Sequence, residues 1–443
     1  MSTLTICIVV AFVIGYMCIA LESLTRVNKA AIALLMCVVC WTLLMTGPAS
    51  FYPEVAPENV LHHIAEVIEH HLGDAAGTLF FLMGAMTIVE IVDSNGGFNF
   101  VRDTMKTRSK RKLLWRVAFM TFFLSAILDN LTTSIVMIMV LRKLVQSRSD
   151  RLLYAGLVVV AANSGGAFSP IGDVTTIMLW IKGVITTQGV LTEIFIPSLV
   201  SMVIPAAILS TQLKGKFDKE QNLPKSDVSQ FTKRQRDIIF WLGVGGLIFV
   251  PIFKTLTHLP PFMGILLVLG ILWTTTEIFH YNTAEDDTMA KRVSDIMTKI
   301  DLSTIMFFLG ILMAVAVLQE VGVLTMLGQI LDSTFEGNHY LVTGIIGVLS
   351  SIVDNVPLVA GCMGMYPVQA AGDLAVDGIF WQLLAYCAGV GGSLLIIGSA
   401  AGVVVMGLEK ITFGWYLKKI TWIAFVGYLA GIVCYWAEKA FLF

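Results

Sequence analysis

The sequence predicts an all-α polytopic membrane protein built from two halves of opposite orientation. Three observations support this fold class. The chain is strongly apolar, its basic residues are confined to particular loops, and short motifs of the first half recur in the second half at a near-constant spacing. We expect about ten crossing helices, two re-entrant hairpins and two interrupted helices, arranged as an inverted repeat.

The composition places the chain in a lipid bilayer. Of its 443 residues, 56% are apolar and 14% are charged, whereas soluble domains carry about 25% charged residues. Because one crossing takes about 20 apolar residues, the chain has room for about ten to twelve crossings and no sizeable soluble domain. An ordinary soluble enzyme is excluded. The basic run at 233–236 indicates a cytoplasmic loop rather than a nucleic-acid patch.

Loop charges indicate which side of the membrane each loop faces. The loops at 94–112, 142–151 and 214–237 are rich in Lys and Arg, which favours the cytoplasm. The loops at 47–75, 321–339 and 366–379 contain no Lys or Arg. All but three of the 29 basic residues then lie at the cytoplasmic face, and both termini lie outside.

Two apolar segments each lie between loops of the same side, so neither is predicted to cross. Segment 113–141 is flanked by two basic loops, and segment 340–365 by two loops without basic residues. An arm of about 15 helical residues rises about 22 Å, which passes the midplane of a core about 30 Å thick without leaving it. We expect two re-entrant hairpins, each with an Asp-Asn pair at its tip. The alternative is a twelve-helix bundle in which 113–141 crosses once.

Three motifs recur in order at an offset of about 226 residues. Thr78-Leu-Phe-Phe-Leu-Met-Gly resembles Thr304-Ile-Met-Phe-Phe-Leu-Gly, and Ser125-Ala-Ile-Leu-Asp-Asn resembles Ser350-Ser-Ile-Val-Asp-Asn. The glycine pair that starts at Gly165 resembles the pair that starts at Gly391. The two copies enter the membrane from opposite sides, so they form an inverted repeat. Many secondary transporters are built in this way, with binding sites at interrupted helices near the midplane.

The repeat divides the chain into two halves and a linker, and glycines interrupt one helix in each half. The expected parts are a first repeat at 1–213 with a hairpin at about 113–141 and a broken helix at about 152–186, a cytoplasmic linker at 214–237, and a second repeat at 238–443 with a hairpin at about 340–365 and a broken helix at about 380–408.

Three acidic residues, Asp129, Asp173 and Asp354, lie near the predicted midplane. An ionisable group there costs roughly 2.5–3.5 kcal/mol on insertion scales, so each one needs a reason. Carboxylate, amide and hydroxyl oxygens are the ligands of a hard cation, and with no Lys or Arg expected nearby these groups would repel an anion. The neutral oxygen donors beside the three aspartates are Asn130, Thr132, Thr133, Asn163, Ser164, Ser169, Thr175, Thr176, Asn355, Ser393 and Ser399.

The same oxygens suggest how two ions could be coupled. A carboxylate in a low-dielectric site can hold either a proton or a metal cation, and each excludes the other. If the site faces the two sides of the membrane in turn, this competition becomes exchange. We expect Na⁺ and a proton to bind in turn at Asp129 and Asp173, with Asn130 and Asn163 as further sodium ligands and no cofactor. The alternative is that the aspartates only cap half-helices, above all Asp354.

Other ionisable residues are expected at the membrane interfaces. Glu90, Asp93 and Glu320 lie near the ends of apolar segments. Segment 61–71 is expected to form a short amphipathic helix along the outer surface, with a solvated polar face in preference to a metal site or a pH sensor. Its histidines are His62, His63, His70 and His71.

Three stretches together resemble the NhaD-type sodium/proton antiporters of bacterial inner membranes, and the size and segment pattern match over essentially the whole chain. The stretches are Ser125-Ala-Ile-Leu-Asp-Asn-Leu-Thr-Thr133, Asn163-Ser-Gly-Gly-Ala-Phe-Ser-Pro-Ile-Gly-Asp-Val-Thr-Thr176 and Ser351-Ile-Val-Asp-Asn355.

The resemblance implies export of Na⁺ and of Li⁺ driven by inward protons, activity favoured at alkaline pH, and a homodimer with a scaffold part and a mobile transport part. It also implies a bacterial inner membrane with both termini periplasmic. The residues that carry over as essential are Asp129, Asn130, Asn163, Asp173, Thr175 and Thr176, together with Asp354 and Asn355.

Other functions remain open on the sequence. A sodium-coupled di- or tricarboxylate symporter of the same superfamily would have the same hairpins, but Ser-Asn-Thr usually occupies their tips, so Asp129 and Asp354 argue against it. An arsenite or other oxyanion exporter meets the same objection. An intramembrane aspartyl hydrolase could use Asp129 and Asp173 as an acid/base dyad, although hydrolysis needs no inverted repeat.

Overall fold

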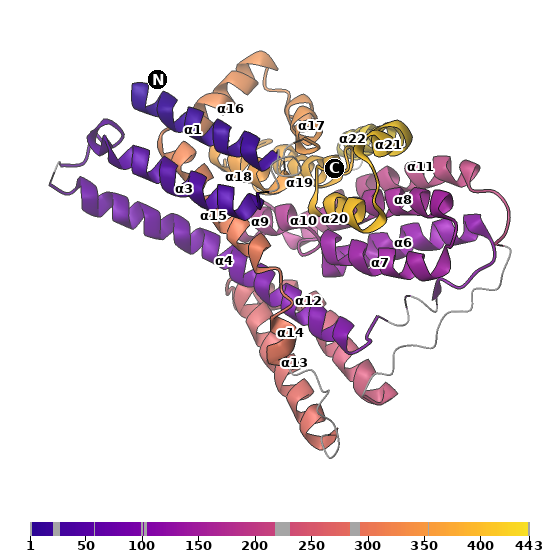
Figure 1. The fold of residues 1–443 in the computed structure, drawn as a ribbon. Coiled ribbons are helices and arrows are strands. Elements are labelled where there is room, and N and C mark those ends of the chain that lie inside the picture. Colours follow the sequence, from indigo (N-terminus) through magenta and orange to yellow (C-terminus); the bar gives the residue numbers. More distant parts are fainter. Residues whose placement is uncertain are drawn as a thin grey trace.

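The chain folds into packed α-helices (Figure 1). The computed structural model describes residues 2–20, 27–56, 58–98, 101, 104–217, 231–283, 293–352 and 354–441. Within these ranges there is no β-strand, only two isolated bridges. Six helical stretches there are long and apolar enough to cross a bilayer: Val60–Ser94, Phe195–Gln212, Lys233–Thr257, Pro261–Tyr281, Leu302–Glu320 and Phe413–Phe441. The all-helical membrane fold expected from composition is confirmed.

The two halves present the same order of helices. The first half contains α1 (Thr3–Ala20), α3 (Lys29–Met45), α4 (Val60–Ser94), α6 (Lys110–Leu128), α7 (Asn130–Leu144), α8 (Arg148–Ala167), α9 (Val174–Lys182) and α11 (Phe195–Gln212). The second half contains α12 (Lys233–Thr257), α13 (Pro261–Thr283), α15 (Leu302–Glu320), α17 (His339–Ser350), α18 (Asn355–Met365), α19 (Ile379–Gly391), α20 (Ala400–Glu409) and α22 (Trp422–Phe441). Shorter elements connect them: η1 (Pro48–Ser50), α10 (Thr187–Glu193), α14 (Val293–Met297), α16 (Val323–Thr334), α21 (Phe413–Tyr416) and the π-turn η2 (Leu417–Thr421).

Helices α6 and α7 form the first hairpin, and both of its ends meet the start of α8. The Tyr154 hydroxyl donates to the Lys110 carbonyl oxygen at 2.7 Å, and the Lys110 ammonium lies 2.7 Å from an Asp150 carboxylate oxygen. At the other end, Arg151 donates to the Val145 carbonyl oxygen at 2.9 Å. The chain therefore enters and leaves on one side, which rules out a single crossing of 113–141 and with it the twelve-helix alternative.

Helices α17 and α18 form the second hairpin in the same manner. The rings of His339, at the start of α17, and Tyr366, directly after α18, lie 6.1 Å apart, and both pack against Phe380 at the start of α19. Both ends of this hairpin therefore lie on one side as well. The hairpins extend over Lys110–Leu144 and His339–Met365, a few residues more than the expected ranges at some of their ends, because polar caps begin the helices.

The first crossing helices of the matched segments, α4 and α15, run in opposite directions side by side. His71 lies near the start of α4 and contacts Glu320 at the end of α15, with 2.9 Å between ring nitrogen and carboxylate oxygen. At the other end of α4, Glu90 lies 2.8 Å from the ammonium of Lys299, which directly precedes α15. The corresponding helices thus have opposite orientation, as an inverted repeat requires.

The helices gather into two groups. Helix α3 packs along α15 and helix α13 along α4, so each half contributes helices to one group with α1 and α12. The hairpins, the broken helices, α11 and α22 make the other group, in which α11 and α22 pack closely. Figure 1 shows α4 and α15 running along the boundary between the groups.

The expected surface helix at 61–71 is wrong. These residues form the first turns of α4, which continues without a break from Val60 to Ser94 over 35 residues. Such a helix is about 52 Å long, well beyond the ~30 Å hydrocarbon core. Helix α4 therefore extends past the bilayer.

The basic residues that the predicted topology leaves on the outer side all have partners. Lys182 lies 3.2 Å from Asp74, and Lys439 lies 2.9 Å from Glu193. Lys254 donates to the Trp180 carbonyl oxygen at 2.8 Å and its ammonium lies over the Trp180 ring. These contacts explain how the three lysines are accommodated away from the basic loops.

Candidate functional site

Matched contacts fix each hairpin against the broken helix of its own half. Ser125 of α6 donates to the Ala162 carbonyl oxygen of α8 at 2.6 Å, and Ser350 of α17 donates to the Ala388 carbonyl oxygen of α19 at 2.9 Å. The two serines are counterparts in the repeat. Their equal contacts place the two hairpin tips at equivalent positions beside the two helix breaks.

Glycines in the broken helices let the hairpin backbones approach closely. A Cβ atom at Gly165 would lie 2.1 Å from the Phe122 carbonyl oxygen, and one at Gly391 would lie 2.1 Å from the Gly347 carbonyl oxygen. No side chain fits at either position. The glycine pairs noticed in the sequence are therefore needed for packing between hairpin and broken helix.

Asp129 forms the tip of the first hairpin with a backbone that few residues other than glycine adopt. Its φ is 94° and its ψ is 161°, in a region where a side chain costs of order 1–3 kcal/mol. The carboxylate accepts from the Thr132 amide at 2.7 Å and from the Thr132 hydroxyl at 3.1 Å. Asp129 thus caps α7, while its charge has no Lys or Arg partner within the described ranges.

Asp173 lies at the first helix break, where α9 begins after the glycine-rich turn. Its exposed fraction is 1%, and its side chain forms no capping hydrogen bond with α9. Asn355, from the tip of the second hairpin, places its amide nitrogen 3.4 Å from Asp173 Oδ2. A Cβ atom at Gly172, the residue before Asp173, would lie 2.8 Å from the Ser125 carbonyl oxygen of α6, so the break lies beside the hairpin tip that carries Asp129. The two carboxylates of the first half therefore belong to one polar region, in which Asp173 is buried and Asp129 is half-buried.

A chain of hydrogen bonds continues this region between the two halves. The Asn130 amide donates to Asn163 Oδ1 at 3.0 Å, and the Asn163 amide donates to the Ser399 hydroxyl at 3.0 Å. Ser399 begins α20 and is the repeat counterpart of Asp173. Each hairpin tip is thus connected to the helix break of the opposite half. Asn130 of the first tip is connected to Ser399 through Asn163, and Asn355 of the second tip contacts Asp173 directly.

The remaining hydroxyl residues fall into two sets. Thr133, Thr175 and Thr176 are buried beside the two aspartates, and the Thr133 hydroxyl has no hydrogen-bond partner among the described residues. The other set binds elsewhere, because Ser164 pairs with Ser201 at 2.9 Å and the hydroxyls of Ser169 and Ser393 donate to carbonyl oxygens. The structure therefore brings most of the expected donors together, whereas Ser164 accepts from Ser201 and the Ser169 and Ser393 protons go to carbonyl oxygens.

Asp354 does not share the surroundings of the other two aspartates. Its carboxylate lies 3.1 Å from the Lys29 ammonium and accepts from the Val356 amide at 3.3 Å. The expectation that no Lys or Arg lies near the three carboxylates is wrong at this position. Lys29 was counted as a loop residue, and its partner is 325 positions away in the sequence, so no local pattern indicated the contact.

A second group missed in the sequence joins the halves at the predicted cytoplasmic end. Glu409, 1% exposed at its side chain, lies 2.8 Å from Arg142 Nε and 2.8 Å from Arg151 Nε. Arg142 also donates to the Leu408 carbonyl oxygen. This triad connects α20 of the second half to α7 and α8 of the first.

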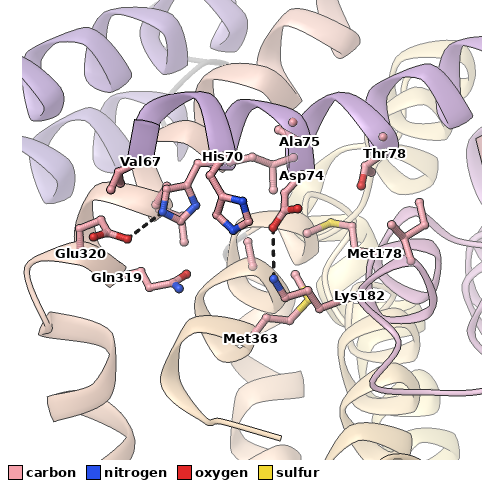
Figure 2. Close-up of a pocket in the computed structure, with 18 of the residues that line it drawn as sticks. Val67, His70, Asp74, Ala75, Thr78, Met178, Lys182, Gln319, Glu320 and Met363 are labelled. Atoms are coloured by element: carbon pink, nitrogen blue, oxygen red, sulfur yellow. Dashed lines mark hydrogen bonds and ion pairs between the residues drawn. The ribbon is translucent and has the colours of Figure 1, made fainter. Parts of the chain in front are cut away.

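Two cavities lie along the boundary between the helix groups. A vestibule of about 870 Å³ at the predicted outer end has both polar and apolar lining residues on α4, α9 and α15 (Figure 2). Figure 2 shows His70, Asp74, Lys182 and Glu320 facing this space, with Asp74 and Lys182 paired. A much smaller cavity of about 20 Å³ touches Asp129. The vestibule therefore lies on the same boundary as the strained hairpin tip.

The other acidic residues at the interfaces are held by partners. Glu320 accepts from the Tyr52 hydroxyl at 2.8 Å besides contacting His71. Burial and the neighbouring Glu320 carboxylate raise the pKa of Tyr52, so Tyr52 remains a donor at neutral pH. Within the described ranges no group of three or more His, Cys, Asp or Glu side chains is placed to hold a metal ion. The site is thus made of carboxylate, amide and hydroxyl oxygens, which suit an alkali cation.

Comparisons with known proteins agree with this architecture. A family model described as a citrate transporter matches residues 16–385. The chain is 47% identical over 96% of its length to sodium/proton antiporter 1 of Arabidopsis thaliana, of which it covers 71%. It is 31% identical over 99% of its length to the Na⁺/H⁺ antiporter NhaD of Alkalimonas amylolytica, of which it covers 91%.

Two further matches extend these similarities. The Na⁺/H⁺ antiporter NhaD of Vibrio cholerae is 30% identical over 98% of this chain, which covers 91% of that protein. Among solved structures, the YdaH transporter of Alcanivorax borkumensis matches with a TM-score of 0.53 at 12% identity, covering 87% of this chain and 90% of that one. The structural match shows the fold, and the sequence matches show the family. The chain belongs to the citrate transporter family and, within it, to the NhaD-type sodium/proton antiporters.

Proposed function

We propose that the chain is a secondary active antiporter that exports Na⁺ in exchange for protons. One observation carries the proposal: the half-buried Asp129 and the buried Asp173 belong to one polar region at the first hairpin tip and the first helix break, and no Lys or Arg pairs with either within the described ranges. Such a pair of carboxylates needs positive charge, which a proton or a metal cation can supply in turn. Relatives named sodium/proton antiporters support the same assignment.

The proposed sodium ligands come from the first hairpin tip and the first helix break. Asp129 and Asp173 supply the charge, and the amide oxygens of Asn130 and Asn163 supply neutral donors. Thr132, Thr133, Thr175 and Thr176 lie close enough in the fold to complete the shell, with Ser399 and Asn355 orienting the amide and carboxylate groups. Li⁺ is a smaller cation that prefers the same oxygen ligands, so we propose it as a second substrate.

Exchange follows from the competition at these carboxylates. A proton that reaches the site from outside displaces Na⁺ toward the outside, and release of that proton into the cytoplasm frees the carboxylates for the next Na⁺. The outer vestibule supplies a water-accessible path toward this boundary from one side. The halves of opposite orientation suit such alternation, because each side of the membrane meets a similar hairpin and break.

Transport of a carboxylate is the second candidate, because the matching family model is described as a citrate transporter. A polyanion would meet the Asp129 and Asp173 carboxylates, which have no basic partner within the described ranges, and Lys29 is already engaged by Asp354. The charges of this site therefore favour a cation. Uptake of radiolabelled citrate or succinate in proteoliposomes would reverse that preference.

The membrane and the assembly are proposed on narrower grounds. A proton gradient must exist across the membrane. We propose a bacterial inner membrane, because NhaD relatives are bacterial, with both termini periplasmic on the loop charges, while the Arabidopsis relatives make a plant membrane the alternative. We propose a homodimer on the family resemblance. Cross-linking in native membranes tests the dimer, and a monomer there would contradict it.

Sodium-driven recovery of a pH-sensitive dye in everted vesicles tests the antiport. Native chain should collapse a preset proton gradient on addition of NaCl, and Asp129→Asn and Asp173→Asn should not. Asp332→Asn is the matched control, because Asp332 lies outside this region and accepts from the Tyr366 hydroxyl. Native rates in either of the first two variants would overturn the proposal.

A further inference from the structure

The two hairpin tips are equivalent in fold and different in charge. The matched serine contacts and the matched glycine approaches place Asp129 and Asp354 at the same point of their hairpins. Each aspartate begins the second helix of its hairpin and accepts a backbone amide of that helix at Oδ1. The two tips can therefore be compared as two copies of one site, and they differ in the group that contacts Oδ2 of the aspartate.

At the first tip, Oδ2 of Asp129 accepts from the Thr132 hydroxyl at 3.1 Å. A hydroxyl is neutral, so the negative charge remains for a cation to balance. At the second tip the repeat counterpart of Thr132 is Pro357, which has no donor. Oδ2 of Asp354 instead lies 3.1 Å from the ammonium of Lys29.

Lys29 is held in place by the helix group opposite the hairpin. It is the first residue of α3, and the Asn28 side chain accepts from the Ala30 amide at 2.8 Å to begin that helix. The Asn28 amide also donates to the Ser303 hydroxyl of α15 at 2.8 Å. The Lys29 ammonium lies 4.2 Å from the centre of the Phe307 ring on the same helix, a favourable cation–π contact.

We propose that Lys29 is a built-in substitute for a cation at the second hairpin tip, and that its removal opens a second sodium site at Asp354. A primary ammonium and Na⁺ carry the same charge, and a carboxylate accepts either. The ammonium is tethered to α3 and cannot be released, so the second tip takes no part in ion release while the first tip does. The proposal rests on the proposed antiport, and it explains why only one of the two matched acidic tips binds and releases the transported ion.

Binding of ²²Na⁺ to the purified full-length chain in detergent tests the inference. Lys29→Met should bind one further sodium ion per chain relative to native chain. The double variant Lys29→Met/Asp354→Asn should return to the native count, because the carboxylate that gained the ion is gone. Lys29→Arg keeps the charge beside Asp354 and is the matched control, expected at the native count.

The outcomes separate this inference from the proposed function. Absence of saturable sodium binding in native chain would overturn the antiport assignment itself. A native count in Lys29→Met, with native chain binding sodium normally, would overturn the role of Lys29 alone. An extra ion that persists in the double variant would also overturn it, since Asp354 would not be the ligand.

A second variant guards against misfolding. Lys29→Gln keeps most of the length and a polar end, and it should show the same additional ion if Lys29→Met is not recovered in folded form. Thermal unfolding gives an independent readout, because a ligand that binds only the folded chain raises the unfolding temperature. Saturating NaCl should raise it more in the Lys29 variant than in native chain, and an equal rise would contradict the proposal.

Discussion

The Asn355 amide nitrogen lies 3.4 Å from Asp173 Oδ2, and these two residues come from opposite halves of the chain. Asp173 sits at the break between α8 and α9, and Asn355 begins α18 at the tip of the second hairpin. The contact links the two halves at a buried carboxylate. A change in the position of the second hairpin therefore acts directly on a proposed sodium ligand.

Asn355→Ala should weaken sodium use without abolishing transport. The variant removes a hydrogen bond to a charged group, which contributes about 1.5–3 kcal/mol, so the sodium concentration for half-maximal antiport should rise about ten-fold. Dye recovery at graded NaCl measures it. Asn338→Ala is the control, because Asn338 caps α17 at its other end, and its sodium dependence should stay native. An unchanged sodium dependence in Asn355→Ala would place Asn355 outside the site.

Asp129→Gly and Asp129→Ala should both lose antiport but differ in stability. Both variants lose the cap on α7, whereas only glycine adopts the φ of 94° without strain. Asp129→Gly should therefore be more stable than Asp129→Ala by about 1–3 kcal/mol. Thermal unfolding in detergent compares them. Equal stabilities would mean that the tip backbone relaxes when the carboxylate is removed.

Ser399→Ala should impair the chain more than Ser393→Ala. Ser399 accepts from Asn163 and caps α20 through the Gly402 amide at 3.2 Å, whereas Ser393 donates only to the nearby Val390 carbonyl oxygen. We expect Ser399→Ala to cost about 1 kcal/mol of stability and to lower the apparent sodium affinity. Ser393→Ala should stay close to native in both. Unfolding temperature and sodium titration are the measurements, and the reverse order would contradict the assignment.

Glu409→Gln should destabilise the chain through two unpaired arginines. Removing the charge of a buried partner costs 3–5 kcal/mol for a fully buried pair, and partial exposure of Arg142 and Arg151 reduces this to about 2 kcal/mol. Asp74→Asn breaks a pair whose side chains are 51% and 52% exposed, and it should cost less than about 1 kcal/mol. Thermal unfolding of the two variants checks the difference. Similar losses would show that the triad adds no more than a surface pair.

Gly391→Ala should disturb the second hairpin, because the new Cβ would lie 2.1 Å from the Gly347 carbonyl oxygen. Overpacking of this kind costs about 1–3 kcal/mol. Gly245→Ala, in α12, meets nothing within 4 Å and should be neutral or stabilising by up to about 1 kcal/mol. Expression level and unfolding temperature test the pair. A native unfolding temperature in Gly391→Ala would mean that the hairpin can move away at little cost.

The sequence predicts most of the local structure and little of the long-range pairing. The Asp-Asn tips and the glycine pairs interrupt apolar helices. Because such interruptions depend on residues that are close in the sequence, the breaks at Asp129 and Asp354 can be predicted from the sequence. The contact of Lys29 with Asp354 joins residues 325 positions apart, and loop-charge counting treats Lys29 only as a topology signal. The contacts of Glu409 with Arg142 and Arg151 were missed for the same reason, because these residues are 267 and 258 positions apart in the sequence.

The extent of α4 shows a different limit of sequence reasoning. The histidine-rich segment has polar residues on a helical face, which is typical of a surface helix, and a loop was expected between it and the crossing segment. The helix instead continues through Gly73 to Ser94. A single glycine costs a helix only about 1 kcal/mol, which packing against α15 and α13 outweighs.

The excess length of α4 also determines where the vestibule meets water. His63 and Glu66 line the vestibule near the start of this helix, several turns before Asp74. Glu66 and His70 in those turns are exposed, so the vestibule opens toward water at this end of α4. The potential of anionic lipids decays over a Debye length of about 8 Å at physiological salt. The distance by which α4 separates the mouth from the headgroups therefore determines how strongly the lipid composition of that leaflet acts on the local ion concentration.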